Sequence, residues 1–287
     1  MGSHERNPLL QVRQLSVEYR SERSKPHQAL DNVTFEIAKG EVVGLMGKSG
    51  CGKTTVALAL LGLLPRGRAK VSGSVLFCGS ELLSMNERAL QKVRGAKISM
   101  IYQEPEIALS PFLRAGDQIA EVVRAHCDWK WNRCQQAALA ALEQIGFDEP
   151  RRIYQSYPHQ LSGGQRQRVV FAQALVCEPA LIIADEPTAS LDARNQAEMI
   201  ELLRGIRMER QVSLLLISHT PEIQASLADR LLVMSQGCVV EQGSFDQLYW
   251  NASHPITNAM LRPSSRKKAN TALRIEAEID AQEQLVR

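Results

Sequence analysis

The sequence has no long hydrophobic run, few aromatic residues and no marked excess of either charge. Its 287 residues include 34 Lys and Arg against 31 Asp and Glu, a formal net charge of +3, and aromatic residues make up 5%. A nucleic-acid-binding surface or a charged disordered chain would show a stronger bias. The apolar stretch Val56–Leu64 is interrupted by Gly62 and is far shorter than the roughly 20 residues of a membrane-spanning helix. We therefore expect a soluble globular chain without a nucleic-acid partner.

The cysteines form no recognisable site. Zinc sites and disulfide frameworks need closely and regularly spaced Cys or His, and this chain has no CxxC pair. The N-terminus also lacks the apolar core of a secretory signal. We expect reduced thiols in a reducing cytosol. The six residues are Cys51, Cys78, Cys127, Cys134, Cys177 and Cys238.

Strand and helix patterns alternate along most of the chain and predict an α/β fold with a largely parallel sheet. The expected strands lie at 10–20, 32–38, 42–46, 73–78, 97–102, 180–184 and 212–218, with a final hairpin at 230–242. The expected helices lie at 53–64, 164–177 and 194–209. Residues 115–146 differ, because they are rich in Ala, Gln and Glu without a strand pattern. We interpret them as part of a helical insertion.

A glycine-rich segment between an expected strand and helix matches the phosphate-binding pattern GxxxxGK[ST]. Its glycines allow successive backbone N–H groups to face phosphate oxygens, and the following helix adds its positive N-terminal end. Lys53 can reach the terminal phosphates, and the hydroxyl of Thr54 suits Mg²⁺. The segment therefore predicts a nucleoside triphosphate site. The residues expected to bind the nucleotide are Gly47, Lys48, Ser49, Gly50, Cys51, Gly52, Lys53, Thr54 and Thr55.

Cys51 admits two interpretations. It lies near a helix N-terminus and Lys53, a setting in which thiols are often reactive. It is equally compatible with an inert small residue of the loop.

Two acidic residues and one histidine follow neighbouring apolar strands. Because functional groups gather at the carboxyl ends of parallel strands, Asp185, Glu186 and His219 should lie near the phosphate-binding loop. Asp185 can hold Mg²⁺ through water, and Glu186 can polarise an attacking water as a general base. His219 can hydrogen-bond a γ-phosphate oxygen or orient the water. Taken alone the acids would more simply cap the next helix, but beside this loop we prefer the catalytic interpretation.

A second anion-binding segment is expected at the start of the helix at 164–177. Ser162 is placed as the N-cap, and Gly163 and Gly164 leave the first backbone N–H groups accessible. An ordinary capped helix would explain Ser-Gly-Gly alone. The full string from Leu161 through Arg168 is more specific evidence for a functional segment than Ser-Gly-Gly alone.

Leu161–Gln165 is identical to the signature sequence of ATP-binding-cassette ATPases, and the chain resembles this family over about residues 9–262. By this resemblance, Gln165 belongs to the segment that binds nucleotide, and Tyr19 is the aromatic residue that stacks on adenine. Gln103 is the glutamine that senses Mg²⁺ and the attacking water, and Asp192 belongs to a short loop that contacts the dimer partner. The other catalytic and metal-binding residues in this resemblance are Lys53, Thr54, Asp185, Glu186 and His219.

The family resemblance implies a P-loop NTPase fold, with a RecA-like parallel core sheet and an antiparallel β subdomain. An ATPase domain at 9–262 would contain a helical subdomain at about 104–160. A charged tail at 263–287, with a possible helix at 271–285, would follow.

In this family two cassettes pair head to tail, with each ATP between the P-loop of one and the signature of the other. Ser162, Gly163 and Gly164 would then touch the partner's γ-phosphate. Binding would close the dimer and hydrolysis would release it. The resemblance implies a cytoplasmic ATPase that is peripheral to the plasma (inner) membrane and drives a channel carried by other chains.

Four further stretches resemble the branch of importers for oligopeptides, dipeptides and nickel. They are Ile98–Pro105, Tyr157–Gln160, Ala228–Met234 and His254–Thr257. This branch implies a second ATPase subunit, identical or different, two transmembrane permease subunits and an extracytoplasmic solute-binding protein. A cassette of a soluble assembly, such as a phosphonate-degrading carbon–phosphorus lyase complex, resembles the same branch and is the alternative.

The expected cofactors are ATP and Mg²⁺. Leu60–Pro65 and Gly73–Val75 resemble the first ATPase subunit of this branch more than the second, and that subunit often carries C-terminal cysteines for an iron–sulfur cluster. No cysteine follows Cys238, so we expect no such cluster.

Overall fold

The computed structural model describes residues 8–21, 24–189 and 191–262. Its core is a six-stranded sheet in the order β10-β9-β3-β8-β7-β6. All neighbours pair in parallel except β10, which is antiparallel to β9. The bounds are β3 Val42–Gly47, β6 Ile98–Ile101, β7 Leu181–Asp185, β8 Ser213–Ile217, β9 Arg230–Ser235 and β10 Cys238–Gly243. Every residue of β3, β7 and β8 is buried, as expected for parallel strands covered on both faces.

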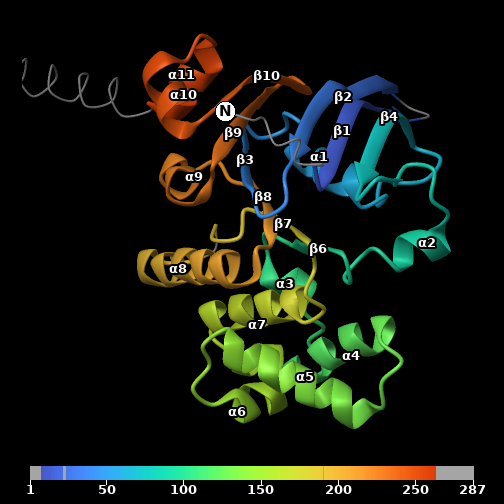
Figure 1. Cartoon of the computed structure of the whole chain (residues 1–287), viewed down its shortest axis with the longest axis vertical. Helices are drawn as coiled ribbons and strands as arrows, with labels where there is room; N and C mark the ends of the chain where they lie inside the picture. Colours follow the sequence, from blue (N-terminus) through green and yellow to red (C-terminus); the bar gives the residue numbers. More distant parts are fainter. Residues whose placement is uncertain (1–7, 22–23, 190, 263–287) are drawn as a thin grey trace, which may run out of the picture.

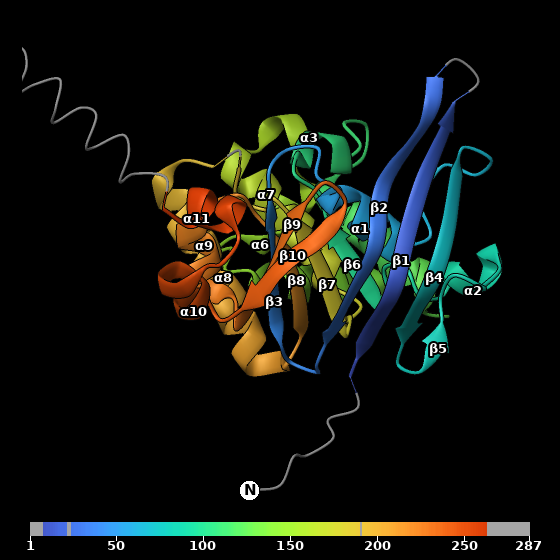
Figure 2. The same ribbon diagram turned by 90° about the horizontal axis from the view of Figure 1, so that it is seen from above.

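A second, antiparallel sheet stands beside the core sheet (Figure 2). Its order is β2-β1-β4-β5, with β1 Leu10–Ser21, β2 Ser24–Ile37, β4 Ala69–Phe77 and β5 Ser80–Glu81. Val12 and Val17 of β1, on the two sides of a register shift in that strand, are buried in one apolar cluster with Val43 and Leu45 of β3 and with helix α1 (Lys53–Leu60). The α/β fold with an antiparallel sheet inferred from the sequence is confirmed.

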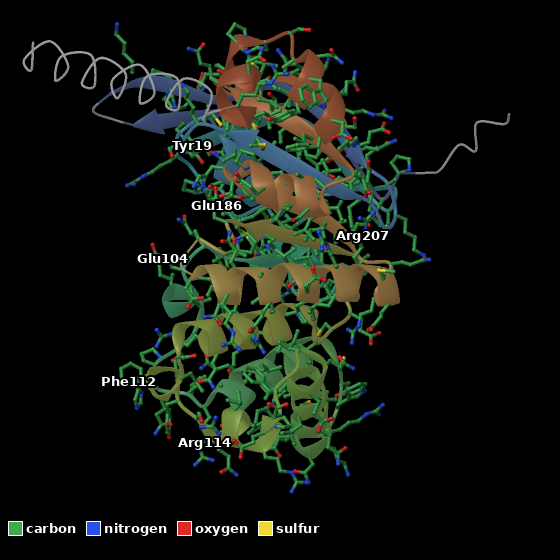
Figure 3. All side chains as sticks on the ribbon, turned by 90° about the vertical axis from the view of Figure 1, so that its left-hand side faces the viewer. Tyr19, Glu104, Phe112, Arg114, Glu186 and Arg207 are labelled. Atoms are coloured by element: carbon green, nitrogen blue, oxygen red, sulfur yellow. The ribbon has the colours of Figure 1, made fainter. Side chains whose placement is uncertain are left out.

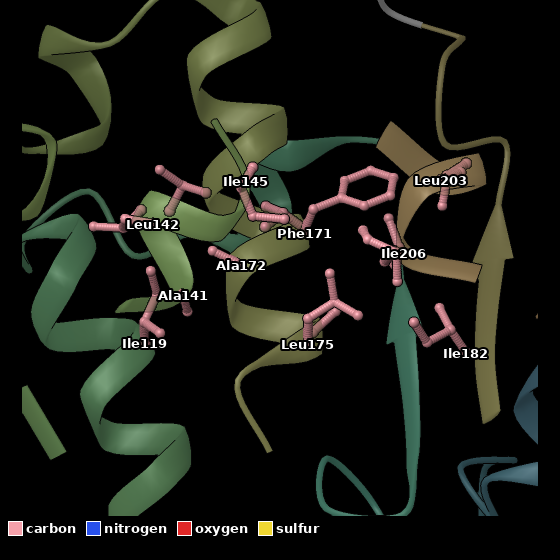
Figure 4. Close-up of a cluster of buried hydrophobic side chains, with 14 of the residues drawn as sticks. Ile119, Ala141, Leu142, Ile145, Phe171, Ala172, Leu175, Ile182, Leu203 and Ile206 are labelled. Atoms are coloured by element: carbon pink, nitrogen blue, oxygen red, sulfur yellow. The ribbon is translucent and has the colours of Figure 1, made fainter. Parts of the chain in front are cut away.

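Three helices form a separate layer at the bottom of Figure 1. They are α4 Ala115–His126, α5 Trp131–Gln144 and α6 Pro150–Gln155; α4 and α5 pack on α7, Gly163–Leu175, and α6 packs on α4 and α5. Figure 4 shows Phe171 of α7 with Leu142 of α5 on one side and Ile182 of β7 and Leu203 of α8 (Ala193–Arg210) on the other. One continuous apolar cluster therefore fixes α7 to both the helical layer and the core sheet.

The remaining elements are short. They are α2 Glu87–Gln91, α3 Pro105–Ala108, the 3₁₀ turn Pro158–Gln160, α9 Pro221–Leu227, α10 Phe245–Asn251 and α11 Pro255–Leu261. None of the helices in the described part of the chain has the length and apolarity needed to cross a membrane.

Three element boundaries differ by four residues or more from the sequence-based expectation, and one of them is the strand expected at 73–78, which begins at Ala69. The helix expected to reach Leu64 ends at Leu60, because Gly62 takes the left-handed conformation (φ 61°). There the Leu63 N–H donates to the Leu58 carbonyl at 2.8 Å, and the Gly62 N–H donates to the Ala59 carbonyl at 3.0 Å, a Schellman ending. The strand expected at 32–38 begins at Ser24, since β2 pairs with nearly the whole of β1. The tail at 263–287 and its expected helix lie outside the described residues.

Two helical glycines predict opposite stability changes on substitution. A Cβ on Gly116 of α4 would lie 2.0 Å from the Tyr154 ring, whose hydroxyl is held by Asp117 at 2.7 Å. A Cβ on Gly205 of α8 would meet no atom within 4 Å. Ala gains about 1 kcal/mol of helix propensity over Gly, whereas overpacking costs about 1–3 kcal/mol. Gly205→Ala should therefore raise the free energy of unfolding by up to about 1 kcal/mol, and Gly116→Ala should lower it.

Urea unfolding followed by circular dichroism measures both changes. Shifts of the two midpoints in the same direction would contradict this packing of α4 against α6.

Candidate active site

The phosphate-binding loop connects β3 to α1, and its shape requires glycine at both ends. A Cβ on Gly47 would lie 2.4 Å from the Cys51 sulfur. Gly52 has φ 113°, and a Cβ there would lie 2.8 Å from the Ala29 carbonyl oxygen. Side chains at these positions would force the loop away from the strands that support it. Between them, Lys48, Ser49 and Gly50 are exposed to solvent at the end of the sheet.

Lys53 and Thr54 begin α1 and point to different partners. The Lys53 ammonium donates to the Gly47 carbonyl at 2.7 Å and to the Lys48 carbonyl at 3.2 Å, so it lies across the loop. The Thr54 hydroxyl donates to Asp185 Oδ2 at 2.9 Å. Thr55, the next residue, is half-buried. The first turn of α1 therefore offers a cation to the loop and a hydroxyl to the end of β7.

Cys51 is buried beneath the loop. Its relative exposure is 7%, and it belongs to the apolar cluster between the two sheets. Its carbonyl accepts a hydrogen bond from the Gly237 N–H at 3.0 Å, which ties the loop to the β9–β10 turn. The structure thus favours the inert interpretation of Cys51 over the reactive one.

Asp185 ends β7 with its side chain almost covered. Its relative exposure is 8%. Burial raises the pKa of this carboxyl and the negative charge of Glu186 raises it further, while the Thr54 hydroxyl and the Lys53 charge act in the opposite direction. An added cation at this position would favour the ionised carboxylate. Asp185 and Thr54 together offer the hard oxygen ligands that Mg²⁺ prefers.

Glu186 and His219 form a close pair across the ends of β7 and β8. Oε1 of Glu186 accepts from the His219 backbone N–H at 2.9 Å and lies 2.7 Å from His219 Nδ1. Because a carboxylate only accepts, this contact requires the proton on Nδ1. Glu186 has a left-handed φ of 48°, and its N–H donates to the Ile217 carbonyl at 2.8 Å. Such strain in a non-glycine residue is typical of functional sites.

The second expected anion site is a capped helix terminus. The Ser162 hydroxyl accepts from the Gln165 N–H at 3.2 Å, and Gln165 Oε1 accepts from the Ser162 N–H at 3.0 Å. The Gln165 amide is therefore used within its own helix cap. Ser162 and Gly163 are exposed, and Gly164 borders a hollow of about 260 Å³ between α6, α7 and α8.

Asp192 caps helix α8 and leads to a residue that sequence reasoning missed. Asp192 accepts from the Asn195 backbone N–H at 2.9 Å and from its side-chain amide at 2.7 Å, and these bonds lower the pKa of Asp192. Asn195 Oδ1 would lie 2.7 Å from a Cβ on Gly164, so Asn195 joins the Asp192 turn to the signature segment. The sequence signal that could have identified Asn195 is its position three residues after the N-cap Asp192.

Tyr19 and Gln103 lie at the margins of the site. Tyr19 on β1 is half-buried and packs against the apolar cluster beneath the phosphate-binding loop. Gln103 follows β6 with an exposed side chain. Figure 3 shows Tyr19, Glu186 and Glu104, the neighbour of Gln103, along one side of the molecule.

The structure thus gathers the expected groups of the phosphate-binding loop, β7 and β8 at one edge of the core sheet. Lys53 and Thr54 come from the start of α1, Asp185 and Glu186 from the end of β7, and His219 from the end of β8. Direct contacts join Thr54 to Asp185 and Glu186 to His219. A cation, two carboxyl groups, a hydroxyl and an imidazole at one edge can bind a polyphosphate with Mg²⁺ and activate water.

Comparison with known proteins agrees with this geometry. The family described as ABC transporter matches residues 30–189. A dipeptide transport ATP-binding protein of Bacillus subtilis is 39% identical over 85% of this chain and 73% of its own length. An oligopeptide transport ATP-binding protein of the same species is 41% identical over 88% of this chain and 77% of its own length.

Among solved structures, a dimeric ATP-binding cassette in a post-hydrolysis state, bound to ADP and phosphate, superposes with a TM-score of 0.72. It is 26% identical, and the match covers 82% of this chain and 98% of that one. The family and the P-loop NTPase fold expected from the signature sequence are confirmed. The chain therefore belongs to the ABC transporter family and is an ATPase of its peptide-importer branch.

Proposed function

We propose that this chain is the ATP-hydrolysing subunit of an importer for peptides or a similar small solute. The observation that carries the proposal is the pairing of Glu186 with His219 at the edge where Thr54 contacts Asp185. The names of the relatives, which are dipeptide and oligopeptide transport ATP-binding proteins, support the solute class.

In this proposal the nucleotide lies on the phosphate-binding loop, with Tyr19 beside the adenine. Its phosphates meet the N–H groups of the loop, and the Lys53 ammonium turns from the Gly47 carbonyl towards them. Thr54 and Gln103 would hold Mg²⁺, with Asp185 acting through water, and the ion would neutralise the charge that develops on the phosphates. The direct contact between Thr54 and Asp185 supports this assignment, because both are oxygen ligands at one point.

Glu186 is the general base in this account. Its carboxylate takes the proton of the attacking water, and His219 holds that carboxylate through the backbone N–H and Nδ1. With Nδ1 donating to Glu186, Nε2 of the exposed imidazole can donate to a γ-phosphate oxygen only when it carries a second proton, as in the imidazolium form. The bonds of His219 to Glu186 thus allow one residue to align the base and to sense the terminal phosphate.

A second ATPase subunit completes the site in this proposal. Ser162, Gly163 and Gly164 are exposed or half-buried at the start of α7, where backbone N–H groups and the helix dipole favour a phosphate. A nucleotide on the loop of one subunit would be covered by these residues of the other. The dimeric state of the solved relative supports this arrangement. The sister subunit is an identical or a related chain.

An apolar surface after Gln103 is proposed to receive the permease subunits. Ile107 is 77% exposed and Phe112 is 86% exposed, and Leu113 is 40% exposed beside them in the chain. Tyr102 and Ala108 of the same segment line a neighbouring hollow of about 290 Å³. Exposed large apolar side chains within one short segment favour a protein-binding surface. Two permease subunits docked here would hold the ATPase at the cytoplasmic face of the membrane, with a solute-binding protein on the other side.

Glu186→Gln should abolish hydrolysis and preserve nucleotide binding. Gln keeps the shape of the side chain and removes its basicity, so turnover should fall by at least ~100-fold. Phosphate release measures turnover, and a fluorescent ATP analogue measures affinity. Glu209→Gln, an exposed change on α8, is the control and should leave both unchanged. Normal turnover in Glu186→Gln would refute the assignment of the base.

Asp185→Asn should stabilise the nucleotide-free protein and impair hydrolysis. Because burial raises the pKa of Asp185, the stability associated with its protonated form is lost as pH rises through that pKa. Asn cannot ionise and can still accept from Thr54. The gain in melting temperature over wild type should therefore be larger at about pH 7 than at about pH 4, close to the ordinary pKa of Asp, while Mg²⁺-dependent turnover falls by at least ~100-fold.

Differential scanning fluorimetry at the two pH values checks the Asp185 prediction. Asp128→Asn, an exposed change before α5, should alter neither quantity. A lower melting temperature for Asp185→Asn at both pH values would contradict the proposed cost of burying this carboxylate.

Phe112→Ser should uncouple the ATPase from the permease subunits. Burial of this apolar side chain against a partner contributes about 1.5–3 kcal/mol to the binding free energy. Its loss should therefore reduce co-purification with membrane subunits by at least about tenfold. Basal hydrolysis by the isolated chain should be retained. Met208→Ser, which is 83% exposed on α8, is the matched control. Recovery of a soluble enzyme core in place of membrane subunits would favour the soluble-assembly alternative.

A further inference from the structure

Two fully buried glutamines donate to backbone carbonyls next in the chain to Glu186 and to His219. Gln167 belongs to α7 and Gln224 to α9, and each has a relative exposure of 0%. Burial of an amide costs free energy unless its donors and its acceptor find partners. We therefore ask which groups the two buried amides contact, since the apolar side chains of the core offer them no hydrogen bonds.

Gln224 holds the end of β8. Its Nε2 donates to the Leu216 carbonyl at 3.1 Å and to the Ser218 carbonyl at 3.2 Å. Because both partners are acceptors, the NH₂ end of the amide must face them. Its Oε1 has no hydrogen-bond partner among the described residues and faces Gly44 of β3, where a Cβ would lie 2.0 Å away. The absent side chain at Gly44 thus makes room for Gln224.

Gln167 holds the chain just after β7. Its Nε2 donates to the Pro187 carbonyl at 2.9 Å, and Pro187 is itself buried. Its Oε1, like that of Gln224, has no partner in the described part of the chain. Gln167 comes five positions after Ser162 on the same helix that presents the signature segment. One amide therefore connects that helix to the residue next to Glu186.

The two amides fix the backbone on both sides of the catalytic pair. Pro187 follows Glu186 in the chain, and Ser218 precedes His219. Glu186 has a left-handed φ of 48°, which costs free energy and persists only when neighbouring contacts impose it. A shift of either anchored carbonyl would lengthen the contacts between Glu186 and His219, which are 2.7 and 2.9 Å long.

We propose that Gln167 and Gln224 are positioning residues that align Glu186 and His219 for hydrolysis. Met would fill a similar volume and avoid the buried, unpartnered oxygen, but it would remove the N–H donors that hold these backbone carbonyls in place. Through Gln167, the alignment of the base also depends on the helix that carries Ser162. This inference rests on the proposed function, because it concerns the same reaction.

The test compares Gln167→Met and Gln224→Met with Thr257→Val, which removes a fully buried hydroxyl from α11. We expect kcat for ATP hydrolysis to fall by about tenfold in each Met variant, with KM within about twofold of wild type and an altered pH profile of kcat. Thr257→Val should leave kcat and the pH profile unchanged. Should Gln224→Met fail to fold, Gln224→Asn, whose amide falls one methylene short, replaces it.

A double-mutant cycle separates positioning from a general structural role. In a His219→Ala background, Gln224→Met should reduce the remaining rate by less than about twofold, because the residue that it aligns is already gone. Equal tenfold losses in both backgrounds, or unchanged kcat in both Met variants, would overturn the inference. Such an outcome overturns only the positioning role, and leaves the proposed function standing, if wild type hydrolyses ATP and Glu186→Gln does not. Absence of hydrolysis in the wild type with its partners would instead overturn the proposed function.

Discussion

The hydrogen bond between Thr54 and Asp185, 2.9 Å long, is the contact on which the rest of the site depends. In the core sheet β8 lies between β3 and β7, so this bond joins the phosphate-binding loop to β7 across the end of β8. His219 leaves β8 at that point and contacts Glu186. Parallel pairing brings all three strand ends to one edge of the sheet. This arrangement costs free energy because it buries the carboxyl group of Asp185.

Helix α7 relates this edge to the rest of the molecule. Its N-terminus presents Ser162 and the two glycines, and its middle inserts Phe171 between the helical layer and the core sheet. Gln167 on the same helix reaches the Pro187 carbonyl beside Glu186. In the proposed function, a partner that moves the helical layer would act through α7 on both the signature segment and Glu186, the proposed base. This packing supports a physical route from the proposed docking surface to the proposed hydrolytic site.

Much of the fold and the site could be predicted because the signals are local. The loop pattern at Lys53, the acids after an apolar strand and the N-cap at Ser162 each occupy a few adjacent residues. Features that depend on distant contacts could not be predicted in this way. The burial of Cys51 depends on the packing of two sheets, and the place of Gln224 depends on the missing side chain of Gly44 in another strand. A glutamine within an apolar helix face was the sequence signal for both buried amides.

The central claim is that ATP hydrolysis at this edge drives the uptake of a solute by partner chains in a membrane. The direct measurement is the ATPase rate of the chain purified from its native membrane with its partners, reconstituted in vesicles with and without short peptides. The account predicts that transmembrane permease subunits co-purify and that peptide, presented with the solute-binding protein, raises the rate several-fold. A complex without membrane subunits, or a rate that no solute changes, would contradict it.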